Sequence, residues 1–153
     1  MSHGGADRRR AIERTLINYC DAVDRGDIDR VVGRFTPDAS VDYGIRTQAT
    51  GRVAIAALFE GLRTTARATS HRLTNVVIDV DGTAAASATS YVTAWHELVQ
   101  PAGRQLVIHG RYRDRLRNVA GDWLIEERRL EVHGASAPVP FHMVDRRPPD
   151  RTT

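Results

Sequence analysis

The sequence contains no lysine, and all 22 of its basic residues are arginine. Against 19 acidic residues they leave a formal net charge of only +3. In the densest arginine cluster, residues 111–117, every second residue is arginine, which is typical of the solvated face of a strand. A contact with a phosphate group is the alternative interpretation. Proteins that bind nucleic acids gather basic and aromatic residues on one surface, so we expect no nucleic-acid partner.

Cysteine and long apolar runs are also scarce. Cys20 is the only cysteine, which excludes an intrachain disulfide and favours a reducing cytoplasm. Its place among apolar helix residues predicts a buried, inert thiol. A membrane span needs about 18 consecutive apolar residues, and no such run exists, so we expect no membrane association. Residues 1–10 are polar and arginine-rich, unlike a secretory signal.

Apolar spacing in the first part of the chain predicts three helices. The first spans residues 8–25, and Gly26 suits its C-terminal cap. Asp27 can cap a second short helix that runs through Phe35, and a third is expected over residues 52–64. The apolar face of the first helix comprises Ile12, Leu16, Tyr19, Cys20 and Val23.

After the third helix the apolar period changes from that of a helix to that of a strand. Glycine-containing turns, above all Asp81-Gly82, separate the apolar segments and favour antiparallel hairpins. A mostly antiparallel sheet with helices gathered on one side is an α+β fold. The expected strands span residues 40–43, 70–80, 83–99, 104–117 and 123–133, with residues 44–50 as a loop or hairpin arm.

The length of 153 residues suits one domain. We expect it over residues 8–133, after a flexible N-terminus at residues 1–7. Most prolines follow Gly134, so residues 134–153 are predicted to be a tail, partly disordered beyond Arg146, in which Val139–Val144 can fold over a pocket mouth.

One carboxylate and one histidine stand out as candidates for chemistry. On a helical wheel Asp24 falls inside the apolar arc, where a carboxylate must be paired or hydrogen-bonded. It can cap backbone amides at the break after the helix, or serve as an acid–base or orienting group in a pocket. His71 begins a predicted strand and can be its partner, although a lone strand histidine is more often a packing or surface residue. We predict a direct hydrogen bond between the two side chains.

Other histidines and the tyrosines are further candidates. His109 lies in the middle of a predicted strand, and we expect it to face the interior together with Val107. His96 and His133 are weaker candidates. No histidine pair has the close spacing of metal ligands, so we expect neither a metal nor a cofactor. Buried tyrosines need hydrogen-bond partners and can polarise a carbonyl; they are Tyr19, Tyr43, Tyr91 and Tyr112.

This order of elements, with the segments Tyr19–Asp27, Phe35–Ala39 and Asp122-Trp123, resembles the SnoaL-like branch of the nuclear transport factor 2-like superfamily. The likeness covers about residues 8–133. It implies a cone-shaped α+β barrel, in which three N-terminal helices and a strongly curved, mostly antiparallel sheet enclose a pocket. That fold carries dehydratases, isomerases, cyclases, epoxide hydrolases and pure binding modules.

At the pocket the chain is most similar to the scytalone dehydratase and bile-acid dehydratase groups. The resemblance implies that Asp24 and His71 form the catalytic pair and that Tyr19 matches the bile-acid dehydratase tyrosine. It further implies that Tyr43 and His109 match a tyrosine and the second histidine of scytalone dehydratase. Val23 departs from the pattern, because scytalone dehydratase has a tyrosine there.

Three functional hypotheses follow. The first is a cofactor-independent dehydratase that acts on a small hydrophobic cyclic or polyketide-like carbonyl compound. The second is an isomerase or polyketide cyclase that uses the same pocket, and the third is a non-catalytic ligand-binding or dimerisation module. The strands over residues 83–99 and 104–117 carry apolar residues on both faces, which predicts a homo-oligomer, dimer or trimer.

Overall fold

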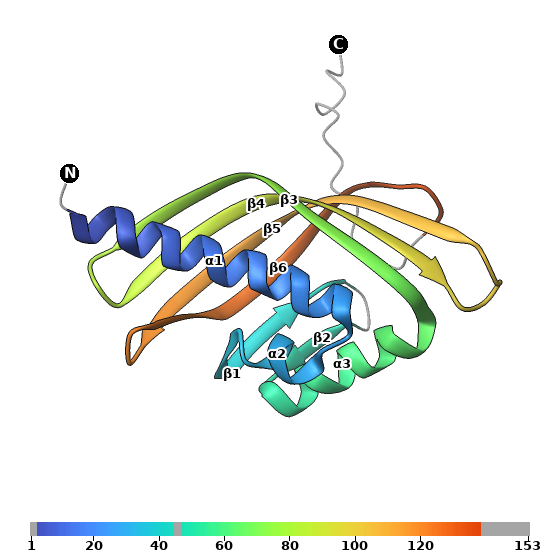
Figure 1. Cartoon of the computed structure of the whole chain (residues 1–153), viewed down its shortest axis with the longest axis horizontal. Coiled ribbons are helices and arrows are strands. Elements are labelled where there is room, and N and C mark those ends of the chain that lie inside the picture. Colours follow the sequence, from blue (N-terminus) through green and yellow to red (C-terminus); the bar gives the residue numbers. More distant parts are fainter. Residues whose placement is uncertain (1–2, 45–46, 139–153) are drawn as a thin grey trace, which may run out of the picture.

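The computed structural model describes residues 3–44 and 47–138. Three helices come first and enclose two short strands; four long strands follow in hairpin succession (Figure 1). The elements are α1 (His3–Arg25), α2 (Ile28–Val32), β1 (Phe35–Asp42), β2 (Gln48–Thr50), α3 (Arg52–Thr65), β3 (Ala66–Asp81), β4 (Ala85–Leu98), β5 (Gln105–Val119) and β6 (Asp122–Ala135).

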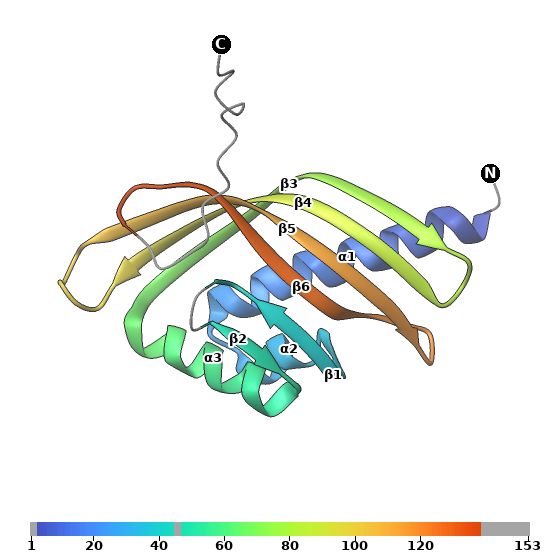
Figure 2. The same ribbon diagram turned by 180° about the vertical axis from the view of Figure 1, so that it is seen from behind.

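The six strands form one open sheet in the order β2-β1-β6-β5-β4-β3. Only β1 and β6 pair in parallel; the other neighbours are antiparallel. The four long strands arch over α1, while α2, α3 and the short strands lie together on the same side (Figures 1 and 2). The predicted α+β fold is therefore confirmed, with a curved sheet whose inner face is covered by helices.

The core lies between α1 and the inner face of the sheet. Ile12, Leu16 and Tyr19 on the predicted face of α1 are at most 2% exposed. Gly26 ends the helix with a φ of +64°, and the amides of Gly26 and Asp27 donate to carbonyls of the last helical turn. Asp27 then caps α2 by accepting from the amide of Arg30, as predicted.

Element boundaries differ from the sequence-based expectations at several places. The strand expected from residue 70 begins at Ala66, so His71 lies within β3 and does not begin it. Residues 3–7, expected to be flexible, form the start of α1, where Arg9 then donates to the carbonyl of Ile78 on β3. The second helix ends at Val32, and β1 begins already at Phe35 and passes through Pro37. The β1–β6 register shifts between Phe35 and Ser40, and such an irregularity accommodates a proline that cannot donate to the ladder.

Two expectations concern the chain ends and membranes. The tail was predicted to begin at residue 134, but β6 continues to Ala135 and Ser136 still exchanges hydrogen bonds with the main chain of Val107. The rest of the predicted tail beyond residue 138, including the segment Val139–Val144, lies outside the described residues. None of the helices among residues 3–44 and 47–138 carries the long apolar stretch that crossing a bilayer requires.

Candidate active site

A cavity of about 150 Å³ lies between the helices and the inner face of the sheet. Most of its lining is aliphatic or aromatic, and its polar atoms come mainly from two groups, a tyrosine cluster and a pair of histidines. The lining residues are Tyr19, Val23, Tyr43, Thr47, Leu58, Phe59, Leu62, His71, Val92, Ala94, His96, Ile108, Tyr112 and Leu130. The molecule thus offers a mostly apolar chamber with few convergent polar groups, as small-molecule sites usually do.

Asp24 and His71 form the predicted contact. The carboxylate lies one residue before the end of α1, and the Oδ1 atom accepts from His71 Nδ1 at 2.7 Å. The Oδ2 atom accepts from the backbone amide of His71 at 2.9 Å, and Oδ1 also accepts from the Thr69 hydroxyl at 2.9 Å. Three bonds from β3 therefore fix the carboxylate, and the sequence had not identified Thr69 as one of the donors.

This geometry determines the protonation pattern of the pair. A carboxylate only accepts hydrogen bonds, so His71 Nδ1 carries a hydrogen, and in the neutral form of the ring Nε2 keeps its lone pair. Burial works to raise the pKa of Asp24, but the hydrogen bonds from His71 and Thr69 more than offset it and lower the pKa below the ordinary value. The His71 side chain is only 6% exposed and lines the cavity, so its free nitrogen is a base without competing water.

His96 is the second histidine of the cavity. Its ring meets that of His71 edge to face, with centroids 5.5 Å apart. The residue is 8% exposed, and Nδ1 finds no hydrogen-bond partner among the described residues. Burial, aided by the nearby His71, lowers the pKa of His96 to about 4, so the ring is neutral at physiological pH.

The buried neutral state of His96 predicts a pH-dependent stability. The unfolded chain takes up the proton near pH 6.5 and the folded chain only near pH 4, so stability falls as pH drops through this window. The loss due to His96 should approach about 3 kcal/mol at its acid end. Urea unfolding of wild type and His96→Gln between pH 4 and 7 measures it, with the exposed His109→Gln as control. Equal pH slopes in wild type and His96→Gln would refute the assignment.

His109 does not face the cavity, and the expected inward orientation is wrong. Its side chain is exposed on the outer face of the sheet, where Nδ1 lies 3.4 Å from the Thr93 hydroxyl. Ile108 and Tyr112, of the opposite parity, are buried and line the cavity. His109 shares its face with the arginines of β5, whose charged heads require solvent. The second histidine expected in the pocket is therefore His96.

Tyr19 and Tyr43 meet at the cavity wall, where their hydroxyl oxygens are 2.9 Å apart. Tyr19 is 2% exposed, whereas Tyr43 is only partly buried. Edge-to-face contacts with Phe35, Phe59 and Tyr112 hold the Tyr19 ring in place. Burial raises the pKa of both phenols, so both stay protonated and can donate a hydrogen bond.

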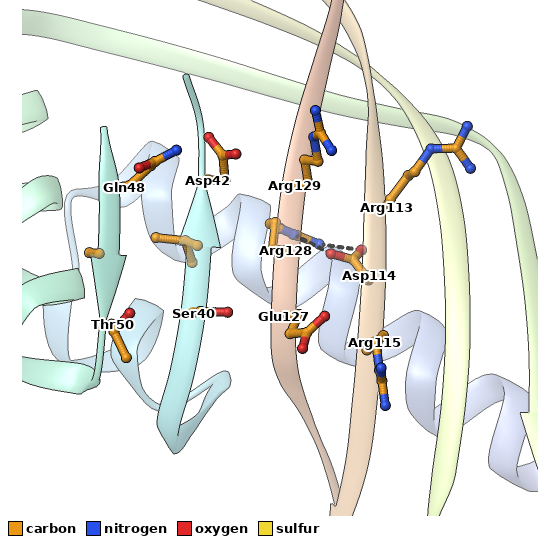
Figure 3. A pocket seen from close by; sticks show the side chains of 12 residues that line it. Ser40, Asp42, Gln48, Thr50, Arg113, Asp114, Arg115, Glu127, Arg128 and Arg129 are labelled. Atoms are coloured by element: carbon orange, nitrogen blue, oxygen red, sulfur yellow. Dashed lines mark hydrogen bonds and ion pairs between the residues drawn. The ribbon is translucent and has the colours of Figure 1, made fainter. Parts of the chain in front are cut away.

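A buried ion pair that the sequence had not revealed lies behind these tyrosines. Arg128 on β6 donates from Nε and Nη2 to the Asp114 carboxylate on β5, at 2.7 and 2.8 Å (Figure 3). Both side chains are fully inaccessible to solvent. The guanidinium carbon lies 4.2 Å from the ring centre of Tyr19 and 4.1 Å from that of Tyr112. The cation thus contacts two phenol rings, which meet each other edge to face with centroids 6.2 Å apart.

A larger hollow, of about 490 Å³, lies over strands β2, β1, β6 and β5. Apart from Val41 and Ala49 its lining residues are charged or polar, and Figure 3 shows them spread along the strands without converging on a common point. Asp114 and Arg128 adjoin it only through their main chains, because their side chains are fully buried. We therefore place the candidate active site in the smaller cavity.

Metal and thiol chemistry find little support in this region. Within residues 3–44 and 47–138, no three histidine, cysteine or acidic side chains are grouped as metal ligands. Cys20 is 5% exposed, and burial raises the pKa of its thiol to about 12, so the predicted buried thiol is confirmed.

Comparisons with known proteins identify relatives of this fold. The family model for the SnoaL-like domain matches residues 6–129. A provisionally named scytalone dehydratase from Novosphingobium aromaticivorans is similar over 100% of both chains, with 28% identity and a TM-score of 0.83. A provisionally named aromatic ring hydroxylase from the same species has 29% identity and a TM-score of 0.78, over 83% of this chain and 90% of the other.

A more distant structure shares the fold alone. The hexachlorocyclohexane dehydrochlorinase LinA-type3 from Novosphingobium barchaimii has 16% identity and a TM-score of 0.79, over 92% of this chain and 96% of its own. Among the curated proteins no sequence matches.

Proposed function

This chain belongs to the SnoaL-like domain family, and we propose that it is a cofactor-independent lyase that removes water from a small, uncharged cyclic carbonyl compound. The observation that carries the proposal is the 2.7 Å bond between Asp24 and His71 at the wall of an apolar cavity. A paired carboxylate leaves His71 Nε2 as a general base in a place without bulk solvent. The name of the relative with 28% identity, a scytalone dehydratase, favours loss of water over isomerisation.

The reaction follows from the positions of these groups. His71 Nε2 takes a proton from the carbon next to the carbonyl, and the released electron pair forms an enolate. A tyrosine hydroxyl at the cavity wall donates to the enolate oxygen as its charge develops. When the carbonyl re-forms, the carbon–carbon double bond is made and the hydroxyl on the next carbon leaves. His71 returns its proton to that hydroxyl, so that water is released and the imidazole is regenerated, while Asp24 stabilises its charged form throughout.

The cavity size limits the substrate to about one ring. An apolar protein cavity of about 150 Å³ holds a benzene molecule, and the volume here is also about 150 Å³. A single six-membered ring fits that space, whereas a fused polycyclic skeleton does not. The near absence of charged side chains in the lining favours a neutral substrate. An open cavity also argues against a purely structural role for the pair.

The test uses 3-hydroxycyclohexanone, which loses water to give 2-cyclohexenone. Formation of the conjugated enone is followed by its ultraviolet absorbance, with wild type, Asp24→Asn and His109→Ala compared at equal concentration. We expect catalysis by wild type, a loss of activity in Asp24→Asn, and unchanged turnover in His109→Ala, whose side chain lies on the opposite face. Equal rates for wild type and Asp24→Asn would refute the proposal.

We also expect the protein to form a dimer or trimer through the outer face of the sheet. Tyr91 is 36% exposed there, and Trp95 and Val107, which are cross-strand neighbours, are only partly buried. A second subunit would cover these apolar groups. Light scattering at micromolar concentration should give a molar mass that is two or three times the 17.0 kDa of one chain. The substitution Trp95→Glu should lower this molar mass. A monomeric wild type would contradict this expectation.

A further inference from the structure

The ion pair between Arg128 and Asp114 takes no direct part in the proposed reaction, yet it lies immediately behind the tyrosines. Both side chains are completely buried, and removing two charges from water costs several kcal/mol for each ion. Apolar residues of similar volume often replace such a pair without loss of stability. Stability alone therefore does not explain why this site holds two charged side chains. The tyrosines that contact the guanidinium suggest a functional reason.

The guanidinium faces the phenol rings of Tyr19 and Tyr112. Tyr19 is in turn hydrogen-bonded to Tyr43 at the cavity wall. Asp114 takes the Nε and Nη2 donors of Arg128, and Nη1 has no hydrogen-bond partner among the described residues. The rings of Tyr19 and Tyr112 both contact the guanidinium, with their centres 4.2 and 4.1 Å from its carbon. Of these two, Tyr19 is hydrogen-bonded to the partly exposed Tyr43. The positive charge of Arg128 thus acts on Tyr19, whose hydroxyl is hydrogen-bonded to that of Tyr43 at the cavity.

The two phenols of this pair are not equivalent. Burial raises the pKa of Tyr19, but the adjacent Arg128 charge and the bond to Tyr43 counteract it. Burial raises the pKa of Tyr43 well above its ordinary value, and the neighbouring Tyr19 adds to that rise. Either hydroxyl could donate in this bond, and the Arg128 cation against the Tyr19 ring favours Tyr19 as the donor to the Tyr43 oxygen. The Tyr43 hydrogen then remains available for a ligand.

We propose that Arg128 is a positioning residue that orients this pair, so that Tyr19 donates to Tyr43 and Tyr43 donates to a substrate oxygen that gains negative charge. Asp114 holds the guanidinium in place against the rings. This inference rests on the proposed function in one respect, the formation of an oxyanion in the cavity. It assigns the substrate contact to Tyr43 and makes Tyr19 a relay.

The experiment uses 4-nitrophenol, a single-ring phenol whose ionised form is yellow and mimics an enolate. The pH at which the bound probe ionises is measured with excess protein for wild type and for the double variant Asp114→Leu/Arg128→Met. The double variant removes both charges and leaves neither buried alone. If it does not fold, Asp114→Asn/Arg128→Gln replaces it with a neutral hydrogen-bonding pair. We expect the bound probe to ionise at least about one pH unit lower in wild type, a tenfold preference for the anion.

Three single variants give matched controls. Tyr43→Phe should abolish most of the shift and Tyr19→Phe part of it, because only the first removes the direct donor. His71→Gln should leave the shift intact, so failure of the dehydratase reaction and failure of this inference are distinguishable. Ionisation of the bound probe at the same pH in wild type and in the charge-free variant would overturn the inference. So would a failure of wild type to bind the probe, since a site built for an oxyanion must accept a phenolate.

Discussion

Replacing His71 by alanine is expected to lower the rate of enone formation by about 100-fold to 10,000-fold, the usual contribution of a positioned general base. The fold should persist, because the side chain lies at a cavity wall and its removal enlarges an existing space. Asp24→Asn should cause a comparable loss, since an amide can donate to Nδ1 and favour the wrong tautomer.

Chemical rescue separates catalysis from structural damage in this experiment. Free imidazole fits the space vacated in His71→Ala and should restore part of the rate, while it should leave wild type unchanged. Circular dichroism controls for folding. A His71→Ala variant that keeps more than half of the wild-type rate would contradict the assignment of His71 as the base.

Replacing Arg128 alone by leucine is expected to cost about 3–5 kcal/mol of unfolding free energy, because it leaves the Asp114 carboxylate buried without a partner. Both side chains are fully inaccessible, and two hydrogen bonds of 2.7 and 2.8 Å would be lost at once. Urea unfolding at neutral pH measures the loss. Asp114→Leu alone should be similarly harmful, since it leaves a buried guanidinium.

The double variant Asp114→Leu/Arg128→Met is the decisive comparison for this pair. Because neither charge is then left alone, it should be more stable than either single variant. Losses that simply add in the double variant would show that the two residues do not act as a pair.

Local patterns in the sequence were sufficient for the fold and for the dyad. The apolar arc of the first helix, the Gly26–Asp27 break and the glycine turns of the hairpins are all encoded within a few residues. Asp24 stood out because a carboxylate inside an apolar arc requires a partner. The catalytic role of the candidates remains a prediction, but the contact of Asp24 with His71 and that of Tyr19 with Tyr43 are present.

The error over His109 has a physical cause that the sequence already contained. Apolar residues occupy both parities of the segment 106–108, so they do not decide which face is buried. The row of arginines from Arg111 to Arg117 has the same parity as His109 and needs solvent. That row was the stronger indication of an outward face, and the same parity argument puts Tyr112 inside.

The partner of Asp114 in the buried ion pair, Arg128, was not accessible from local patterns. Asp114 lies between two arginines, and Arg128 is one of four consecutive charged residues. Such charged neighbours are typical of solvent-exposed positions. Asp114 has the same parity as the buried Tyr112, so its burial follows from the alternation of β5. Arg128 is buried because the register of β5 and β6 shifts between Arg115 and Leu116, which reverses the alternation of β6 between Ile125 and Arg128. Such an irregularity changes which face a residue occupies and carries no local sequence signature here.

Deuterium incorporation into cyclohexanone tests the central claim most directly, because this ketone has no leaving hydroxyl and reports proton removal alone. The carbon next to the carbonyl is monitored by NMR in heavy water with wild type and His71→Gln. The account predicts that deuterium exchange is faster with wild type than in buffer alone. It also predicts that with His71→Gln the exchange rate falls to that of buffer. Exchange that is equally fast with both proteins would contradict the claim that His71, held by Asp24, is the base of this cavity.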